Sequence, residues 1–244
     1  MKHILISALI LVLFVPYLWA QDANELLKRV DDNLMPESYE SYRKLINEEP
    51  DGKRKEFTFY TVKKGKDSLA MLYLAPASDK GRATLRMGDN MWLYIPNVGK
   101  PIRITSLQSI TGGVFNNADI MLLDYSVEYN ASILEQNEKE YILDLKAKNK
   151  TVAYDKLKMW ISKKDELVSK IECYSASGML IKTLEFKQIK DFGNGLVRPS
   201  VMETYSPLYK GYRSYMVYSQ IKARKFKDEM FTLNYLPKLE GLRK

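Results

Sequence analysis

The side chains that most often carry covalent chemistry are nearly absent from this chain. Its only histidine is His3 and its only cysteine is Cys173. His3 lies in an N-terminal segment that we expect to be removed, so the mature chain would have no histidine for a Ser-His or Cys-His nucleophile, for proton transfer or for most zinc sites. A single cysteine also excludes an intramolecular disulfide.

The remaining candidates for chemistry have simpler structural interpretations. Cys173 stands in the alternating run 171–174, which is typical of a strand with a half-buried thiol. The adjacent carboxylates of Asp31 and Asp32 fall at the end of a helical pattern, where solvation explains them. Gly112 and Gly113 stand alone, without the spacing of a phosphate-binding loop. The sequence therefore predicts a binding protein without catalytic residues, metal or cofactor, and not an enzyme.

The charge is basic but mixed. The chain has 38 Lys and Arg against 30 Asp and Glu, a formal net charge of +8, and the two signs interleave along the sequence. No dense basic tract carries interleaved aromatic residues, which argues against nucleic acid as a partner. A diffuse attraction to anionic lipid headgroups fits better, and a solvated surface of charged strands is the simpler alternative.

The first twenty residues have the pattern of a secretory signal peptide. A basic start, residues 1–3, precedes the apolar run 4–15, and the small residue Ala20 precedes the polar pair Gln21 and Asp22. The apolar run is shorter than the ~20 residues that span a bilayer. We expect cleavage near Ala20, export to the periplasm and one domain over residues 21–244. An uncleaved anchor is the alternative.

The mature sequence reads as one helix followed by many strands. Apolar residues recur at helical spacing over 22–34, with Asp22 and Glu25 as a capping pair, and Pro36 ends the pattern. From Tyr39 onward the period is two, and turn residues separate about eleven strands without helices between them. This pattern predicts a mainly β fold, a curled antiparallel up-and-down sheet, because so many twisted strands seldom lie flat.

One apolar segment, residues 105–124, interrupts the strand pattern. We expect two short helical pieces in it, one starting at 106–110 and one over 117–123. Its apolar residues are Leu107, Ile110, Val114, Phe115, Ile120, Met121 and Leu122. A solvated loop would not carry so many, so we expect a lid or plug over one face of the sheet. An ordinary core-closing insert is the alternative.

The stretch from residue 88 to residue 125 resembles a known family. It contains GDNMWLYIP at 88–96, Arg103-Ile104, the glycine pair at 112–113, Asp119-Ile120 and Asp124-Tyr125. This order is similar to the LolA-like family of outer membrane lipoprotein-sorting proteins. The resemblance implies an unclosed antiparallel β-barrel with helices in its concave side. It also implies acyl-chain transport across the periplasm, between an inner-membrane donor transporter and an outer-membrane acceptor. Residues 113–119 depart from the family pattern.

The hairpin around Gly88 decides which side chains share a face. A two-residue loop, the commonest kind, places Leu85 and Met87 with Trp92 and Tyr94, and directs Arg86 to solvent. A three-residue loop would place them with Met91, Leu93 and Ile95. The candidate ligand-binding residues of the groove and lid are Leu85, Met87, Trp92, Tyr94, Leu107, Ile110, Phe115, Ile120 and Met121. Packing of the N-terminal helix is the alternative role for Trp92 and Tyr94.

These observations together predict a periplasmic carrier that binds acyl chains of lipoproteins or lipids in an apolar groove and delivers them to the outer membrane. The alternatives are a lipid-shuttling partner of an inner-membrane exporter, an envelope sensor, or a structural domain whose groove is its core.

Overall fold

The computed structural model describes residues 22–243, so the expected signal peptide at 1–20 lies outside the described residues. The first strands are β1 (Tyr39–Glu48), β2 (Arg54–Lys64), β3 (Ser68–Ala75), β4 (Ala83–Met87), β5 (Asn90–Tyr94) and β6 (Ile102–Ile104). The later strands are β7 (Tyr129–Gln136), β8 (Glu140–Ala147), β9 (Lys156–Ser162), β10 (Val168–Tyr174), β11 (Leu180–Asp191), β12 (Val197–Ser206) and β13 (Tyr209–Ala223). The helices are α1 (Ala23–Leu34), α2 (Asn117–Ile120), α3 (Tyr125–Glu128) and the 3₁₀ helices η1 (Asp228–Phe231) and η2 (Leu233–Arg243).

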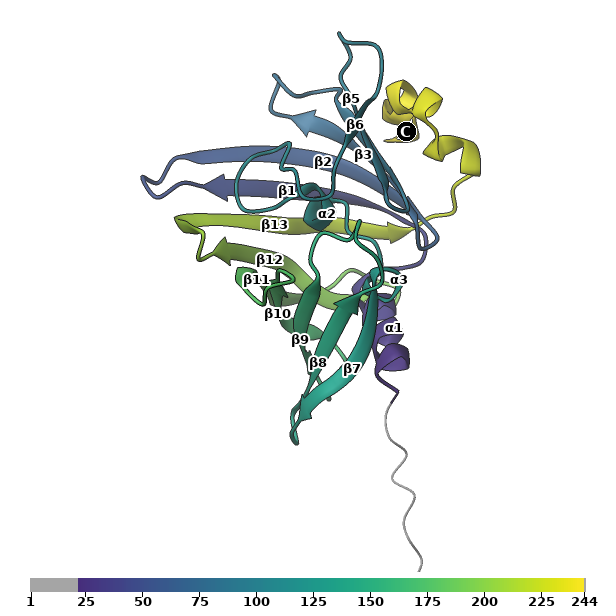
Figure 1. Cartoon of the computed structure of the whole chain (residues 1–244). Helices are drawn as coiled ribbons and strands as arrows, with labels where there is room; N and C mark the ends of the chain where they lie inside the picture. The colour runs from purple at the N-terminus through teal and green to yellow at the C-terminus, as the bar shows by residue number, and fades with distance from the viewer. Residues whose placement is uncertain (1–21, 244) are drawn as a thin grey trace, which may run out of the picture.

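The strands form one antiparallel sheet with two free edges (Figure 1). The thirteen strands in the described part of the chain are ordered β6-β5-β4-β3-β2-β1-β13-β12-β11-β10-β9-β8-β7. The chain starts in the middle at β1, runs outward to β6, crosses to the opposite edge at β7, and returns to pair β13 with β1. This confirms the expected unclosed up-and-down barrel, with thirteen strands in place of about eleven.

The segment that crosses between the edges is the lid, residues 105–128. It contains little regular structure, only the single turns α2 and α3. The turn expected at 106–110 is not helical, and residues 125–128 form α3. In Figure 1 the lid lies across the middle strands, with α2 in front of β1 and β13. The topology thus requires this chain segment to cross the curved face.

Alternation along the strands gives the sheet two apolar faces. On β3, Leu69 and Met71 lie on the face that carries α1 and the lid, whereas Ala70 and Leu72 lie on the opposite face. We call the first group the concave cluster. Its members include Leu26, Leu27 and Val30 of α1, Phe115, Ile120, Met121 and Tyr125 of the lid, and Leu45, Phe57, Phe59, Leu69, Met71, Tyr73, Met91, Leu143, Leu145, Leu157, Met159, Ile161, Ile171, Cys173, Leu184, Met202 and Met216 of the sheet.

The opposite face is covered by the C-terminal cover, residues 226–243. Its buried apolar residues pack on β2, β3 and β4 in what we call the outer cluster. The cluster contains Tyr60, Val62, Ala70, Leu72, Ala83, Leu85, Phe226, Phe231, Leu236, Leu239 and Leu242. Leu236, Leu239 and Leu242 recur every third residue, which suits a 3₁₀ helix with three residues per turn. No element was expected here from the sequence.

Helix α1 closes one end of the concave cluster, and its last turn supports the lid. Asp22 caps α1 by accepting a 2.9 Å hydrogen bond from the Asn24 backbone N–H. Asp31 is 5 % exposed, so its expected solvation is wrong. Its two carboxylate oxygens each accept a 2.8 Å hydrogen bond, from the backbone N–H groups of Tyr125 and Ser126. These are the free N–H groups at the start of α3.

The hairpin of β4 and β5 has the expected two-residue loop. Met87 pairs with Asn90 and Leu85 with Trp92, so Gly88 and Asp89 form the turn. The expected solvent exposure of Arg86 is wrong: its side chain is 2 % exposed. The face opposite Leu85 is the concave face, where a carboxylate of the lid pairs with the Arg86 guanidinium.

Candidate functional site

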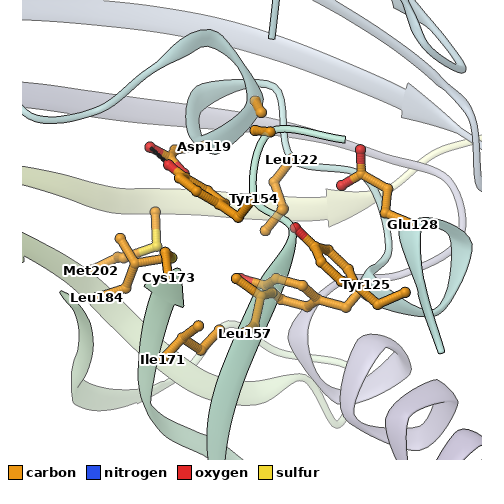
Figure 2. A pocket seen from close by; sticks show the side chains of 13 residues that line it. Asp119, Leu122, Tyr125, Glu128, Tyr154, Leu157, Ile171, Cys173, Leu184 and Met202 are labelled. Atoms are coloured by element: carbon orange, nitrogen blue, oxygen red, sulfur yellow. Dashed lines mark hydrogen bonds between the residues drawn. The ribbon is translucent and has the colours of Figure 1, made fainter. Parts of the chain in front are cut away.

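A cavity lies directly under the lid, against strands β9 to β12 (Figure 2). About 20 Å³ of it is accessible to the centre of a water-sized sphere, so the cavity is narrow with the lid in place. The lining residues are Ala118, Asp119, Leu122, Tyr125, Glu128, Tyr129, Ala153, Tyr154, Leu157, Ile171, Cys173, Leu184 and Met202. Its walls are mostly aliphatic and aromatic, with few polar groups at the lid side, as ligand cavities usually are.

Asp119 fixes the lid above this cavity. Its carboxylate accepts hydrogen bonds from the Tyr154 hydroxyl at 2.9 Å and from Lys182 Nζ at 2.8 Å (Figure 2 draws the tyrosine contact). It also accepts a 2.9 Å bond from the Asn116 backbone N–H, while the Asn116 side chain caps α2 in return. One lid carboxylate thus satisfies donors from three separate parts of the chain.

Three buried ion pairs join the lid to the sheet. Asp119 pairs with Lys182 of β11. Asp124 pairs with Lys63 of β2. The third lid carboxylate, Glu128, pairs with Arg86 of β4. Buried pairs of this kind add little net stability, because desolvation offsets their attraction, but removing one partner alone is costly. They therefore hold the lid in a defined position more than they stabilise the fold.

Two arginines also bind the lid backbone. Arg43 of β1 donates a 3.0 Å hydrogen bond to the carbonyl of Ile120, and Arg86 donates a 3.0 Å bond to the carbonyl of Met121. These carbonyls follow α2, where a helix end leaves acceptors free. The side chains of Ile120 and Met121 are meanwhile buried in the concave cluster. Polar donors and apolar packing therefore act on the same two lid residues.

The glycine pair of the lid sits against the middle strands. Asn47 of β1 donates a 3.1 Å hydrogen bond to the Thr111 carbonyl, and Ser214 of β13 accepts a 2.9 Å bond from the Val114 N–H. Gly113 has φ +73°, and a Cβ built there would lie 2.1 Å from Asn47 Oδ1. Gly112 has the same φ but open space around it. Gly113 is therefore required by close approach as well as by its backbone conformation.

Burial shifts the pKa values of two titratable groups near the lid. Burial raises the pKa of the Cys173 thiol well above its ordinary value, so the thiol stays protonated at neutral pH. Burial also raises the pKa of Asp31 to about 7, although its hydrogen bonds from Ser126 and Tyr125 act in the opposite direction. Within residues 22–243 no group of three or more His, Cys, Asp or Glu side chains is placed to hold a metal ion.

Of the expected binding set, four of the five lid residues lie in or against the concave cluster. Phe115, Ile120 and Met121 are buried in it, Ile110 packs against it, and Leu107 is 62 % exposed. Their part in ligand binding is untested.

The hairpin residues lie elsewhere. Leu85, Trp92 and Tyr94 belong to the outer cluster, and Met87 is 42 % exposed. They share a face as the register predicts, but the C-terminal cover occupies that face. The same placement separates Trp92 and Tyr94 from α1, so their alternative role in packing the N-terminal helix does not hold either.

Sequence reasoning missed the buried cations Arg43, Lys63 and Lys182. Alternation carries a usable signal: Phe57, Phe59 and Thr61 precede Lys63 at every second position, which puts Lys63 on the same face. A lysine at such a position is usually assigned to solvent. Its partner Asp124 lies on a distant lid, and no local pattern connects the two.

We compared the chain and its fold with known proteins. A protein-family model described as "Uncharacterized protein" matches residues 65–238. No curated protein matches the chain. The structure is similar to that of a LolA superfamily protein from Nitrosomonas europaea, with a TM-score of 0.81 and 28 % identity, covering 88 % of this chain and 100 % of that one.

Two further solved structures share the fold. A DUF1329 family protein from Desulfovibrio piger has a TM-score of 0.77 at 22 % identity, covering 87 % of this chain and 97 % of that one. An outer membrane lipoprotein-sorting protein domain from Vibrio parahaemolyticus has a TM-score of 0.74 at 18 % identity, covering 88 % and 98 %. In the part of the chain that the structure describes, no helix has the length and apolar character needed to cross a membrane.

Proposed function

We propose that this chain, which belongs to the LolA-like family of outer membrane lipoprotein-sorting proteins, carries acyl chains in the space between its sheet and its lid. The fold is that of a binding family. The cargo, the periplasmic location and the delivery route are our proposals. The route runs from an inner-membrane donor transporter to an outer-membrane acceptor, with no chemical step on the way.

The observation that carries the proposal is an apolar cavity roofed by a segment that polar groups hold in place. The lid joins two unpaired sheet edges and has two single helical turns as its only helices in the described chain. A segment with so little internal structure can separate from the sheet without unfolding it. The concave cluster would then expose a large apolar surface that an acyl chain can cover.

Acyl burial supplies the free energy for such an exchange. Each buried methylene contributes ~0.8 kcal/mol, so a chain of ordinary length offsets the loss of several lid contacts. Met71, Met159 and Met202 lie in the concave cluster. Their flexible side chains adapt to variable chains more readily than branched residues do. The existing cavity is the starting point of the site, and lid displacement would enlarge it.

Cargo analysis tests the proposal. The exported mature protein, purified in mild detergent, is extracted and the extract is identified by mass spectrometry. Triacylated peptide supports a lipoprotein carrier, and glycerolipid or fatty acid supports a lipid shuttle working with an exporter. Absence of any acyl compound, together with no binding of a fluorescent fatty-acyl probe, overturns the proposal and leaves a sensor or structural role.

A pair of variants locates the site. Ala153 lines the cavity and Trp92 lies in the outer cluster. Ala153→Trp fills the cavity, so probe affinity should fall by about tenfold, which corresponds to roughly 1.4 kcal/mol. Trp92→Asp should leave probe affinity unchanged. Equal effects of the two variants, with far-UV circular dichroism intact in both, would place the acyl site outside the cavity.

A further inference from the structure

The concave side carries more positive charge than an acyl shelter requires. Five cations point into it and are buried: Arg43, Lys63, Arg86, Lys182 and Arg198. Lys63, Arg86 and Lys182 pair with the three lid carboxylates. Arg43 and Arg198 have no carboxylate within ion-pair distance anywhere in residues 22–243. A buried charge without a partner is costly, so two such charges in one place call for an explanation.

The two unpaired arginines meet over one tyrosine. The guanidinium carbon of Arg198 lies 4.3 Å, and that of Arg43 5.7 Å, from the ring centre of Tyr218. Burial acts to raise the pKa of Tyr218, but the two guanidinium charges outweigh it, and this pKa lies below its ordinary value. The local field thus favours an anion.

The remaining hydrogen bonds of these arginines go to neutral groups. Arg43 donates to the Thr61 hydroxyl at 2.7 Å as well as to the lid carbonyl. Arg198 donates to the carbonyls of Pro199 and Leu34. These contacts orient the guanidinium groups without neutralising them. A guanidinium held in this way can donate its remaining N–H groups to an oxygen of a carboxylate or phosphate.

A second pocket opens beside these arginines. It is also narrow: about 30 Å³ of it is accessible to the centre of a water-sized sphere. Its lining residues are Asp31, Leu34, Met35, Tyr39, Arg43, Lys63, Leu122, Leu123, Asp124, Tyr125, Phe186, Arg198, Met202 and Tyr218. Of its two carboxylates, Asp124 pairs with Lys63, and the pKa of Asp31 is raised by burial to about 7. The pocket therefore keeps a net positive charge.

The two cavities adjoin. Leu122, Tyr125 and Met202 line both of them. Two of these three residues, Leu122 and Tyr125, belong to the lid, so displacement of the lid would join the two spaces. One space is apolar and the other is cationic. This arrangement matches an amphiphile that has a hydrocarbon tail and a negatively charged head.

We propose that the pocket formed by Arg43, Arg198 and Tyr218 binds the anionic headgroup, a phosphate or a carboxylate, of a lipid whose tail occupies the neighbouring cavity once displacement of the lid has enlarged it. This inference rests on the proposed function and specifies its cargo class. The triacylated cysteine of a lipoprotein has no anionic group of its own, so the pocket favours an anionic lipid over that cargo.

Matched lipid pairs test the inference with the mature full chain. Oleic acid is compared with oleyl alcohol, and phosphatidic acid with diacylglycerol of the same chains, by displacement of a neutral fluorescent acyl probe. We expect the anionic member of at least one pair to bind about tenfold tighter or more. The pair that shows the preference identifies carboxylate or phosphate as the head. Equal binding within both pairs overturns the inference while the proposed function stands, and no binding of any lipid overturns both.

Arginine variants locate the preference. Arg198→Gln and Arg43→Gln should bring the anionic-to-neutral affinity ratio close to one, and Arg198→Lys should keep part of it. Arg54→Gln, at a side chain 60 % exposed, is the control and should keep the full ratio. A ratio unchanged in the folded glutamine variants overturns the assignment. If both fail to fold by circular dichroism, a ratio below the wild-type value in folded Arg198→Lys supports the assignment, because lysine lacks the additional donors of the guanidinium, and a ratio equal to that of the wild type contradicts it.

Discussion

The sheet has two covers, and they are attached in different ways. The C-terminal cover packs on the outer face mainly through apolar side chains such as Phe231 and Leu239. Its polar contacts with the strands are more exposed: an ion pair between Lys64 and Asp228, and a 2.8 Å hydrogen bond from Arg224 to the Leu242 carbonyl. The lid packs on the concave face too, but three buried ion pairs and two arginine hydrogen bonds to its backbone also hold it. Apolar packing fills space and favours one closed arrangement. The ion pairs and hydrogen bonds of the lid can be replaced by contacts with water or with a ligand.

This difference indicates that the concave face, under the lid, is the functional one. A permanent cover needs only buried area, and the C-terminal cover has it. The lid depends on charged groups whose net contribution is small when both partners are present and large when one is missing. Such a cover has a defined position when closed, and it can separate from the sheet as one segment. The following predictions test that contrast, from the largest expected effect to the smallest.

Removal of one lid carboxylate should have the largest effect. Asp119→Ala leaves Lys182 buried without a carboxylate and should lower the free energy of unfolding by roughly 3–5 kcal/mol, measured by urea titration. The double variant Asp119→Ala/Lys182→Met removes both charges and should recover most of that loss. A double variant as unstable as the single one would show that the lid depends on packing, like the outer cover.

Asp31, whose carboxyl group accepts hydrogen bonds from the start of α3, should make the free energy of unfolding depend on pH. The pKa of Asp31 is raised from 3.8 to about 7 by burial, so the folded chain binds a proton that the unfolded chain releases between these values. Its stabilising contribution is complete below pH 4 and is lost as the pH rises through 7, by up to about 4 kcal/mol. Urea midpoints from pH 4 to pH 8 should show this decline in the wild type. Asp31→Asn should remove it, and Asp32→Asn should keep it.

Truncation in the outer cluster should change stability alone. Leu239 is 1 % exposed, and Leu239→Ala should cost about 3 kcal/mol in unfolding free energy. Acyl-probe affinity of the folded variant should stay at the wild-type value, because the C-terminal cover does not contact the cavity. Weakened probe binding at full helicity and sheet content would contradict the separation of the two faces.

The glycine pair offers the finest comparison. Gly113→Ala puts a Cβ against Asn47 and Ser214, and should cost about 1–3 kcal/mol and loosen the lid. Gly112→Ala has open space and adds only the strain of its positive φ. Thermal unfolding should therefore rank Gly113→Ala below Gly112→Ala. The opposite rank would mean that the contacts at Asn47 do not hold the lid.

The sequence predicts the sheet well because turn residues and a period of two are local signals. The lid is predictable for a similar reason, as an apolar stretch that interrupts the strands. The face of the hairpin is not predictable in this way: alternation separates Leu85 from Arg86 but does not say which of them faces inward. That depends on the C-terminal cover, far away in the chain, which has no α-helical periodicity to reveal it.

The charges of the site escape sequence reasoning for another physical reason. A lone Lys or Arg on a strand is normally solvated, and burial is acceptable only with a partner. The partners Asp119, Asp124 and Glu128 sit on the lid, so the pairing appears only in three dimensions. The expectation for Arg86 failed on this point, as did the expectation for Asp31.

Hydrogen exchange followed by mass spectrometry tests the central claim most directly. The exported mature protein is measured alone and saturated with an acyl ligand. We predict that the ligand changes the exchange of amides in the lid, residues 105–128, and leaves those of η1 and η2 unchanged. Identical exchange of the lid in the two states, or an equal change in both covers, would contradict the account of a movable concave cover and a permanent outer one.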